Sequence, residues 1–179
     1  MKLAVNEHIV LERTSSKYAP ELFQIIDRNR NYLSEFLPWV PGMKLESDFY
    51  GYISNAVTKN EEKYEASFTI LYNEEAVGRI GLHHINWNNK NAAIGYWIDQ
   101  DKNGKGIVIN ACKRLIKYGF EELNLNRIEI KAAVNNIKSQ AIPQKLNFKE
   151  EGILRQAELV NNEYLDIKVF SMLKEEYQE

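Results

Sequence analysis

The sequence contains a single cysteine, Cys112, among its 179 residues. One thiol excludes an internal disulfide and most structural zinc sites, which need several cysteine or histidine ligands. This scarcity is typical of proteins in the reducing cytoplasm, where we expect the chain to act. Cys112 also falls on the apolar stripe of a predicted helix, which favours a buried packing role over a reactive one.

Long hydrophobic runs and an excess of either charge are missing too. No stretch approaches the roughly 18–20 apolar residues that a membrane-spanning helix requires, and the first 15 residues lack the apolar region of a signal peptide. The 23 lysines and arginines nearly balance the 25 aspartates and glutamates, which gives a net charge of −2. We therefore expect neither a membrane nor a nucleic acid among the partners of this protein.

Repeats, low-complexity tracts and flexible linkers are absent as well. Hydrophobic residues make up 44% of the chain and charged residues 27%, as in an ordinary soluble globular protein. The length suits one domain with its own core. We therefore expect a single domain over residues 1–179.

Apolar periodicity predicts strands and helices that alternate in the second half of the chain. The expected elements, in order, are strand 8–15, helices 18–36 and 46–60, strands 64–72, 75–85 and 91–99, helix 107–123, strand 127–134, helix 136–146 and a final hairpin that turns at 161–162. A second two-residue hairpin turn is expected at 73–74. This order predicts an α/β fold with a mixed sheet of about seven strands and helices on both faces.

Two glycines, Gly104 and Gly106, bracket Lys105 where an apolar strand gives way to the helix over 107–123. The first amides of a helix have no intrahelical partner, and glycine lets an anion approach the backbone closely. The spacing matches neither a P-loop nor a dinucleotide-binding loop. From this motif alone, a plain tight turn and an anion site both stay open.

Four segments form a wider pattern over nearly the whole chain. They read "FLPWV", "GRIGLHHINWNNKNAAIGYWID", "NGKGI" and "NRIEIKAAVNNIKSQAIPQKLNFKEEGILRQAEL". In this order and spacing they resemble the GNAT superfamily of acetyl-CoA-dependent N-acetyltransferases, and within it the RimJ/RimL type, which acetylates the N-termini of ribosomal proteins. The resemblance implies a mostly antiparallel GNAT sheet, acetyl-CoA as cosubstrate and no metal.

By this resemblance, the loop before the helix holds the pyrophosphate of coenzyme A. The family pattern Q/R-x-x-G-x-G/A runs here from Asp101 to Gly106, so Asp101 departs from it at the first position. The backbone over 96–98 would pair with pantetheine as an added strand. The implied coenzyme contacts are Tyr96, Trp97, Ile98, Asn103, Gly104, Lys105, Gly106, Ile107, Asn136 and Ser139.

Acetyl transfer from a thioester needs a neutral amine, donors for the oxyanion and a proton for the departing thiolate. By resemblance, Glu158 is the general base and Ser139 gives its proton to the thiolate. Taken alone, Glu158 is most simply a solvent-facing strand residue, and a helix-cap role is the alternative for Ser139 and Asn136. Pro143 has no N–H, so in a helix the carbonyl of Ser139 would lose its usual donor.

Two tryptophans in loops, Trp39 and Trp87, are candidates for the acceptor channel, and half-buried packing is the alternative for each. The adjacent His83 and His84 point to opposite faces of a strand, so we expect no metal site there.

Three functions fit these residues. The first hypothesis is acetyl transfer to the N-terminal α-amine of a ribosomal or similar protein, by direct attack in a ternary complex. The second keeps acetyl-CoA but takes a small amine, such as a polyamine, an amino acid or an antibiotic. The third is a non-catalytic, coenzyme A-binding regulatory module, which Ser139 and Glu158 disfavour and Asp101 favours. The resemblance also favours a homodimer.

Overall fold

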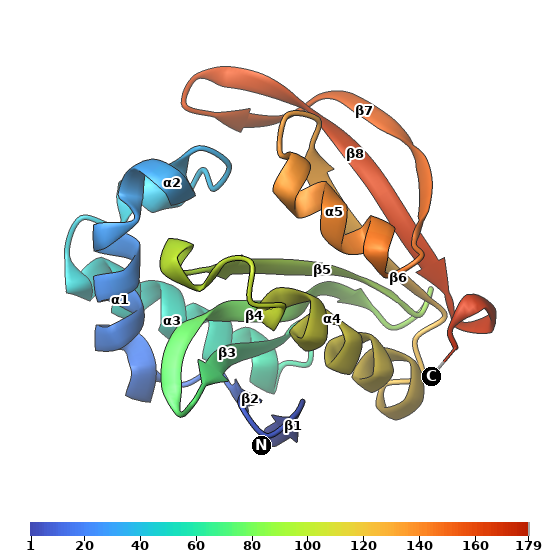
Figure 1. Cartoon of the computed structure of the whole chain (residues 1–179), viewed down its shortest axis with the longest axis horizontal. Helices are drawn as coiled ribbons and strands as arrows, with labels where there is room; N and C mark the ends of the chain where they lie inside the picture. Colours follow the sequence, from blue (N-terminus) through green and yellow to red (C-terminus); the bar gives the residue numbers. More distant parts are fainter. Residues whose placement is uncertain (179) are drawn as a thin grey trace.

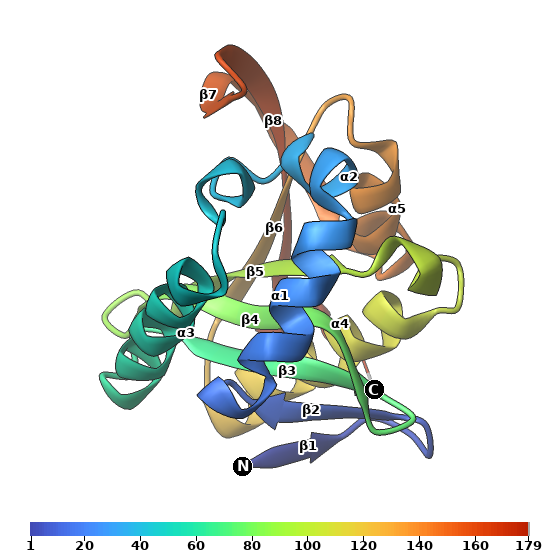
Figure 2. The ribbon, with the colours of Figure 1, turned by 90° about the vertical axis from the view of Figure 1, so that its left-hand side faces the viewer.

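A computed structural model describes residues 1–178 and shows one sheet with helices on both faces (Figures 1 and 2). The strand order is β1-β2-β3-β4-β5-β6-β8-β7. The strands are β1 (Lys2–Ala4), β2 (Ile9–Arg13), β3 (Ala66–Tyr72), β4 (Glu75–Asn86), β5 (Asn91–Ile98), β6 (Arg127–Ala133), β7 (Lys149–Val160) and β8 (Glu163–Leu173). Every neighbouring pair is antiparallel except β5 and β6.

The expected mixed, mostly antiparallel sheet is therefore confirmed. It has eight strands instead of about seven, because the three residues Lys2–Ala4 pair with β2. Both predicted hairpin turns are present, since Asn73, Glu74, Asn161 and Asn162 all have positive φ angles between 49° and 70°. Two consecutive residues with positive φ form a two-residue hairpin turn whose twist matches that of the flanking strands.

Five α-helices join these strands. They are α1 (Ala19–Arg28), α2 (Arg30–Ser34), α3 (Glu46–Glu61), α4 (Ile107–Lys117) and α5 (Ile137–Lys145). The single helix expected over 18–36 is wrong, because the buried Asn29 divides it and its side-chain amide donates to the carbonyl of Ile25 at 2.8 Å. The helix expected over 107–123 ends instead in a π-helical turn at Tyr118–Glu122.

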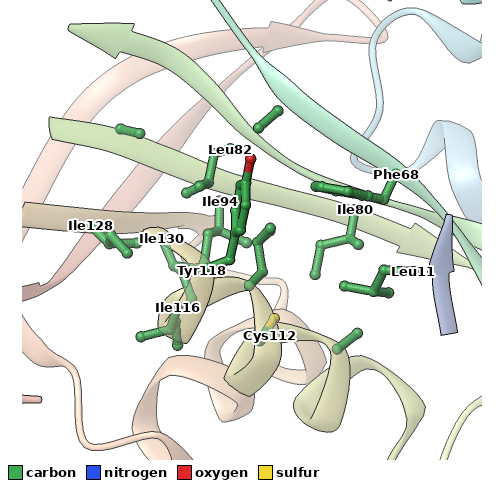
Figure 3. Close-up of a cluster of buried hydrophobic side chains, with 14 of the residues drawn as sticks. Leu11, Phe68, Ile80, Leu82, Ile94, Cys112, Ile116, Tyr118, Ile128 and Ile130 are labelled. Atoms are coloured by element: carbon green, nitrogen blue, oxygen red, sulfur yellow. The ribbon is translucent and has the colours of Figure 1, made fainter. Parts of the chain in front are cut away.

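The core has two layers, one on each side of the sheet. Helix α4 packs against one face, where the sulfur of Cys112 points among strand residues such as Ile94 and Ile130 (Figure 3). Cys112 is fully buried, which confirms its packing role. Helices α1 and α3 cover the other face with residues that include Leu22 and Phe49. No helix in residues 1–178 has both the length and the apolar character needed to cross a bilayer.

The two parallel strands separate part-way along their length. Register pairs join β5 to β6 only from Asn91↔Arg127 to Ile94↔Ile130, yet β5 continues to Ile98 and β6 to Ala133. The last part of β5 therefore keeps a strand neighbour, β4, on one side only. This separation creates an opening beside the start of α4.

Gly78 of β4 tests how tightly this part of β5 is held. A Cβ on Gly78 would lie 2.2 Å from the carbonyl oxygen of Trp97, so the backbone of β5 would have to move. We expect Gly78→Ala to lower the free energy of unfolding by about 2 kcal/mol or more, measured by urea denaturation. The control is Gly51→Ala on the exposed side of α3, where nothing lies within 4 Å and a gain of about 0.5–1 kcal/mol is expected. Equal effects of the two changes would contradict this view of β4 and β5.

Candidate active site

A cleft of about 820 Å³ opens where β5 and β6 separate. Its walls come from the end of β5, the loop that leads into α4, the first turns of α5, and the segment 32–37 at α2. All the coenzyme contacts expected from the sequence line this cleft, except Lys105, whose side chain is exposed. The structure therefore brings residues from four separate parts of the chain to one place.

The glycine loop presents a run of free backbone amides to this cleft. Gly104 and Gly106 have φ angles of 77° and 72°, a region that costs a residue with a Cβ conformational strain. The first helical bond of α4 runs from the amide of Asn110 to the carbonyl of Gly106 at 3.1 Å. Within residues 1–178, the six N–H groups over 104–109 have no hydrogen-bond acceptor.

This geometry fits an anion better than a plain turn. Consecutive N–H groups around a left-handed residue form a concave anion site, and the positive end of the α4 dipole adds to it. Three cationic side chains, Lys102, Lys138 and Lys145, line the same cleft. The amides and lysines together suit a diphosphate such as the one in coenzyme A.

Asp99 anchors this loop, a role that the sequence analysis missed. Its buried carboxylate accepts hydrogen bonds from Arg28 and, at 3.0 Å, from the side chain of Asn29, both from the end of α1. It also accepts a bond from the amide of Asp101 at 3.4 Å. Burial raises the pKa of Asp99, but these hydrogen bonds outweigh that effect and hold the pKa below its ordinary value. An acidic residue at the end of the strand predicted over 91–99 was the only local signal.

Asn136 and Ser139 lie where the first turn of α5 faces β5. The side chain of Asn136 accepts a hydrogen bond from the amide of Ser139 at 3.1 Å, so the capping role of Asn136 is confirmed. Ser139 is not the cap. Its hydroxyl lies 3.2 Å from the phenol oxygen of Tyr96, and both side chains line the cleft.

Glu158 lies outside the residues that line the cleft. It stands on β7 beyond a bulge between Leu154 and Glu158, near the tip of the β7–β8 hairpin. That tip is held over α2, because the side chain of Asn161 donates to the carbonyl of Ser34 at 2.9 Å. Glu158 is exposed, yet desolvation of its carboxylate raises its pKa, and within residues 1–178 the carboxylate has no hydrogen-bond or ion-pair partner.

The structure separates the two tryptophans expected at the acceptor channel. Trp39 stacks on Tyr52 at 4.9 Å and lies 6.2 Å from the ring of Trp97, so it stands behind a residue that lines the cleft. Trp87 lies in a different hollow, beside Tyr64, where its indole N–H donates to the carbonyl of Lys63. Trp87 is therefore not part of this site.

The comparison with known families agrees with this geometry. The family model described as "Acetyltransferase (GNAT) domain" matches residues 8–149. The chain belongs to this GNAT acetyltransferase family. The expected class, an acetyl-CoA-dependent N-acetyltransferase, is thereby confirmed, and the hypothesis of a non-catalytic module loses its support.

Individual relatives cover nearly the whole chain. YdaF of Bacillus subtilis (strain 168), provisionally named a ribosomal N-acetyltransferase, is 37% identical over 97% of this chain and 96% of its own. The ribosomal-protein-serine acetyltransferase of Escherichia coli (strain K12) is 30% identical over 96% of both. A crystal structure of the microcin C7 self-immunity acetyltransferase MccE, in complex with acetyl-CoA and AMP, is 31% identical over 94% of both chains with a TM-score of 0.91.

A branched side chain at Gly106 tests the amide run. We expect Gly106→Val to weaken acetyl-CoA binding at least tenfold by calorimetry, because the Cβ branch crowds the amides and strains a positive φ. Gly152→Val on β7 is the control, since Gly152 also has a positive φ, of 148°, but lies outside the cleft. A similar loss of affinity in both variants would show that backbone strain, and not the amide run, explains the result.

Proposed function

We propose that this enzyme transfers the acetyl group of acetyl-CoA to the N-terminal α-amine of a ribosomal or similar protein, by direct attack in a ternary complex. One observation carries this proposal: a single cleft is lined by the start of α4, by Ser139 and by the segment 32–37 at α2. A donor held at one end and an amine entering at the other would meet beside β5. The full-length relatives named for ribosomal substrates support this acceptor.

The coenzyme end of the cleft relies on the backbone. The amides over 104–109 would hold the pyrophosphate, with Asn103 and the cleft lysines beside them. The backbone over 96–98, which has a strand neighbour on one side only, would pair with the pantetheine arm. Acetyl-CoA supplies the activated acyl group, and these contacts fix its direction relative to Ser139 and Asn136.

The chemistry then needs two proton transfers. The amine nitrogen forms a bond to the acetyl carbon, and the bond from that carbon to sulfur breaks. Ser139 gives its hydroxyl proton to the departing sulfur and later regains one from solvent. The excess proton on the new amide nitrogen leaves through water to the carboxylate of Glu158. The proposal includes a relaying water because Glu158 does not belong to the residues that line the cleft.

Glu158 is suited to this task by its environment. Desolvation of the carboxylate, without a cationic partner to offset it, raises the pKa of Glu158 and makes it a stronger base. Its end of the hairpin is fixed to α2, whose neighbour Glu35 lines the cleft. Two acidic side chains at this end would attract an incoming ammonium group, while the lysines serve the phosphates at the other end.

A small-molecule acceptor is the second candidate. One observation favours it: MccE, which is similar over nearly its whole length, has a crystal structure in complex with acetyl-CoA and the small molecule AMP. Mass analysis of products from a panel of N-terminal peptides, polyamines, amino acids and nucleotides separates the two candidates. Acetylated peptides alone would support the first proposal, and acetylated small amines alone would overturn it.

We also propose a homodimer. Four apolar residues on the β7–β8 hairpin are about half exposed or more, namely Ile153, Leu154, Leu159 and Tyr164. The first three lie on the edge strand β7, where exposed apolar residues favour association with a second copy. A monomeric mass in light scattering at micromolar concentration would contradict this assembly.

The role of Glu158 predicts a pH-dependent loss. We expect Glu158→Gln to lower kcat about 100-fold and to leave the KM for acetyl-CoA nearly unchanged. In the unaltered enzyme, kcat should fall as the pH drops through the pKa of Glu158, which lies above the ordinary glutamate value, because only the ionised form accepts a proton. This acidic limb should disappear in the variant. Glu163→Gln, an exposed change on β8, serves as the control.

A further inference from the structure

Helix α5 contains a proline, and the structure shows what replaces its missing hydrogen bond. In an α-helix the carbonyl of Ser139 would accept from the N–H four residues later, which is Pro143 and has none. The phenol of Tyr96 donates to this carbonyl instead, at 3.0 Å. A side chain of β5 therefore completes the backbone bonding of α5 across the cleft wall.

Ser139 is held at three of its polar atoms. Its amide donates to the side chain of Asn136 at 3.1 Å, and its carbonyl accepts from Tyr96. Its hydroxyl oxygen lies 3.2 Å from the same phenol oxygen. A phenol has one proton, and the carbonyl takes it, so the Ser139 hydroxyl is the donor in the third contact.

We propose that Tyr96 is a positioning residue for Ser139: its phenol takes the place of the N–H that Pro143 lacks and holds the Ser139 hydroxyl in the cleft. This goes beyond a backbone contact between β5 and pantetheine, and it rests on the proposed role of Ser139 as proton donor. Tyr96 transfers no proton in this arrangement. It accepts a hydrogen bond from the hydroxyl at rest, and this contact fixes where the Ser139 oxygen lies before its proton turns to the sulfur.

The surroundings of the phenol suit this role. Burial raises the pKa of Tyr96 above its ordinary value, so the phenol stays protonated and keeps donating over the working pH range. The ring packs against the core under α4, which limits its movement. A helical carbonyl without a donor costs more free energy than one formed hydrogen bond contributes. The hydrogen bond from Tyr96 to the Ser139 carbonyl therefore also fixes the first turn of α5.

A stability comparison tests the structural half of the proposal without any acceptor. We expect Tyr96→Phe to lower Tm by about 3–6 °C, because the Ser139 carbonyl loses its donor. Pro143→Ala restores an N–H at that position, so the same Tyr96→Phe change should lower Tm by less than half as much in the Pro143→Ala protein. An equal loss of Tm in both proteins would overturn the proposal, because the phenol would not be replacing that N–H.

A kinetic comparison tests the positioning half. We expect Tyr96→Phe to lower kcat about tenfold while the KM for acetyl-CoA changes less than threefold, and Ser139→Ala to lower kcat further. Adding Tyr96→Phe to Ser139→Ala should then lower kcat by less than twofold, since the hydroxyl that Tyr96 holds is already gone. In the double variant Tyr96→Phe/Pro143→Ala, the Tm lost in Tyr96→Phe should largely return, while kcat stays as low as in Tyr96→Phe.

Two results would overturn the positioning role: full kcat in Tyr96→Phe, or recovery of kcat together with Tm when Pro143→Ala is added. The second would show that the phenol only completes the helix. Failure of the proposed function looks different. If Ser139→Ala keeps full kcat, Ser139 is not the proton donor, yet the Tm comparison still decides whether Tyr96 replaces the missing N–H.

Discussion

The early end of the pairing between β5 and β6 is the constraint on which the site depends. Parallel strands in a sheet normally stay paired along their length, and here they share only four register positions. The separation leaves backbone groups of β5 without a second strand and places α5 across from the start of α4 (Figure 1). Because main-chain groups form much of the proposed coenzyme end, we expect this end to tolerate changes in side chains. Asp101 illustrates this: its amide bonds to Asp99 and its side chain is exposed.

Features that depend on local sequence could be predicted. Paired polar residues at 73–74 and 161–162 set the two hairpin turns, since few other residues accept consecutive positive φ angles. The apolar stripe of α4 and the glycine pair before it depend only on helical spacing and on helix-end chemistry. The family resemblance then supplied the ligand, which no periodicity could name.

Features that depend on distant contacts could not be predicted. Asn29 ends α1 because its side chain also meets Asp99, seventy residues away in sequence. Trp87 had the same local signature as Trp39, and only the direction of the β4–β5 hairpin carries it away from the cleft. For Tyr96 the sequence predicted a backbone role, while its phenol bonds to Ser139 across the cleft wall. Pro143 signalled the missing N–H, but nothing in the sequence named the group that replaces it.

The two ends of the cleft differ in how freely they can change. The proposed coenzyme end lies within residues 8–149, where the family model matches, and it would rely on amides that most substitutions leave in place. The hairpin that carries Glu158 begins where that match ends, and the hydrogen bond from Asn161 to Ser34 ties it to α2. In the proposed function these two segments form the acceptor end together, so a change in one is expected to alter the position of the other. Relatives with different acceptors should therefore differ at the hairpin and α2 jointly, while the amide run before α4 stays the same.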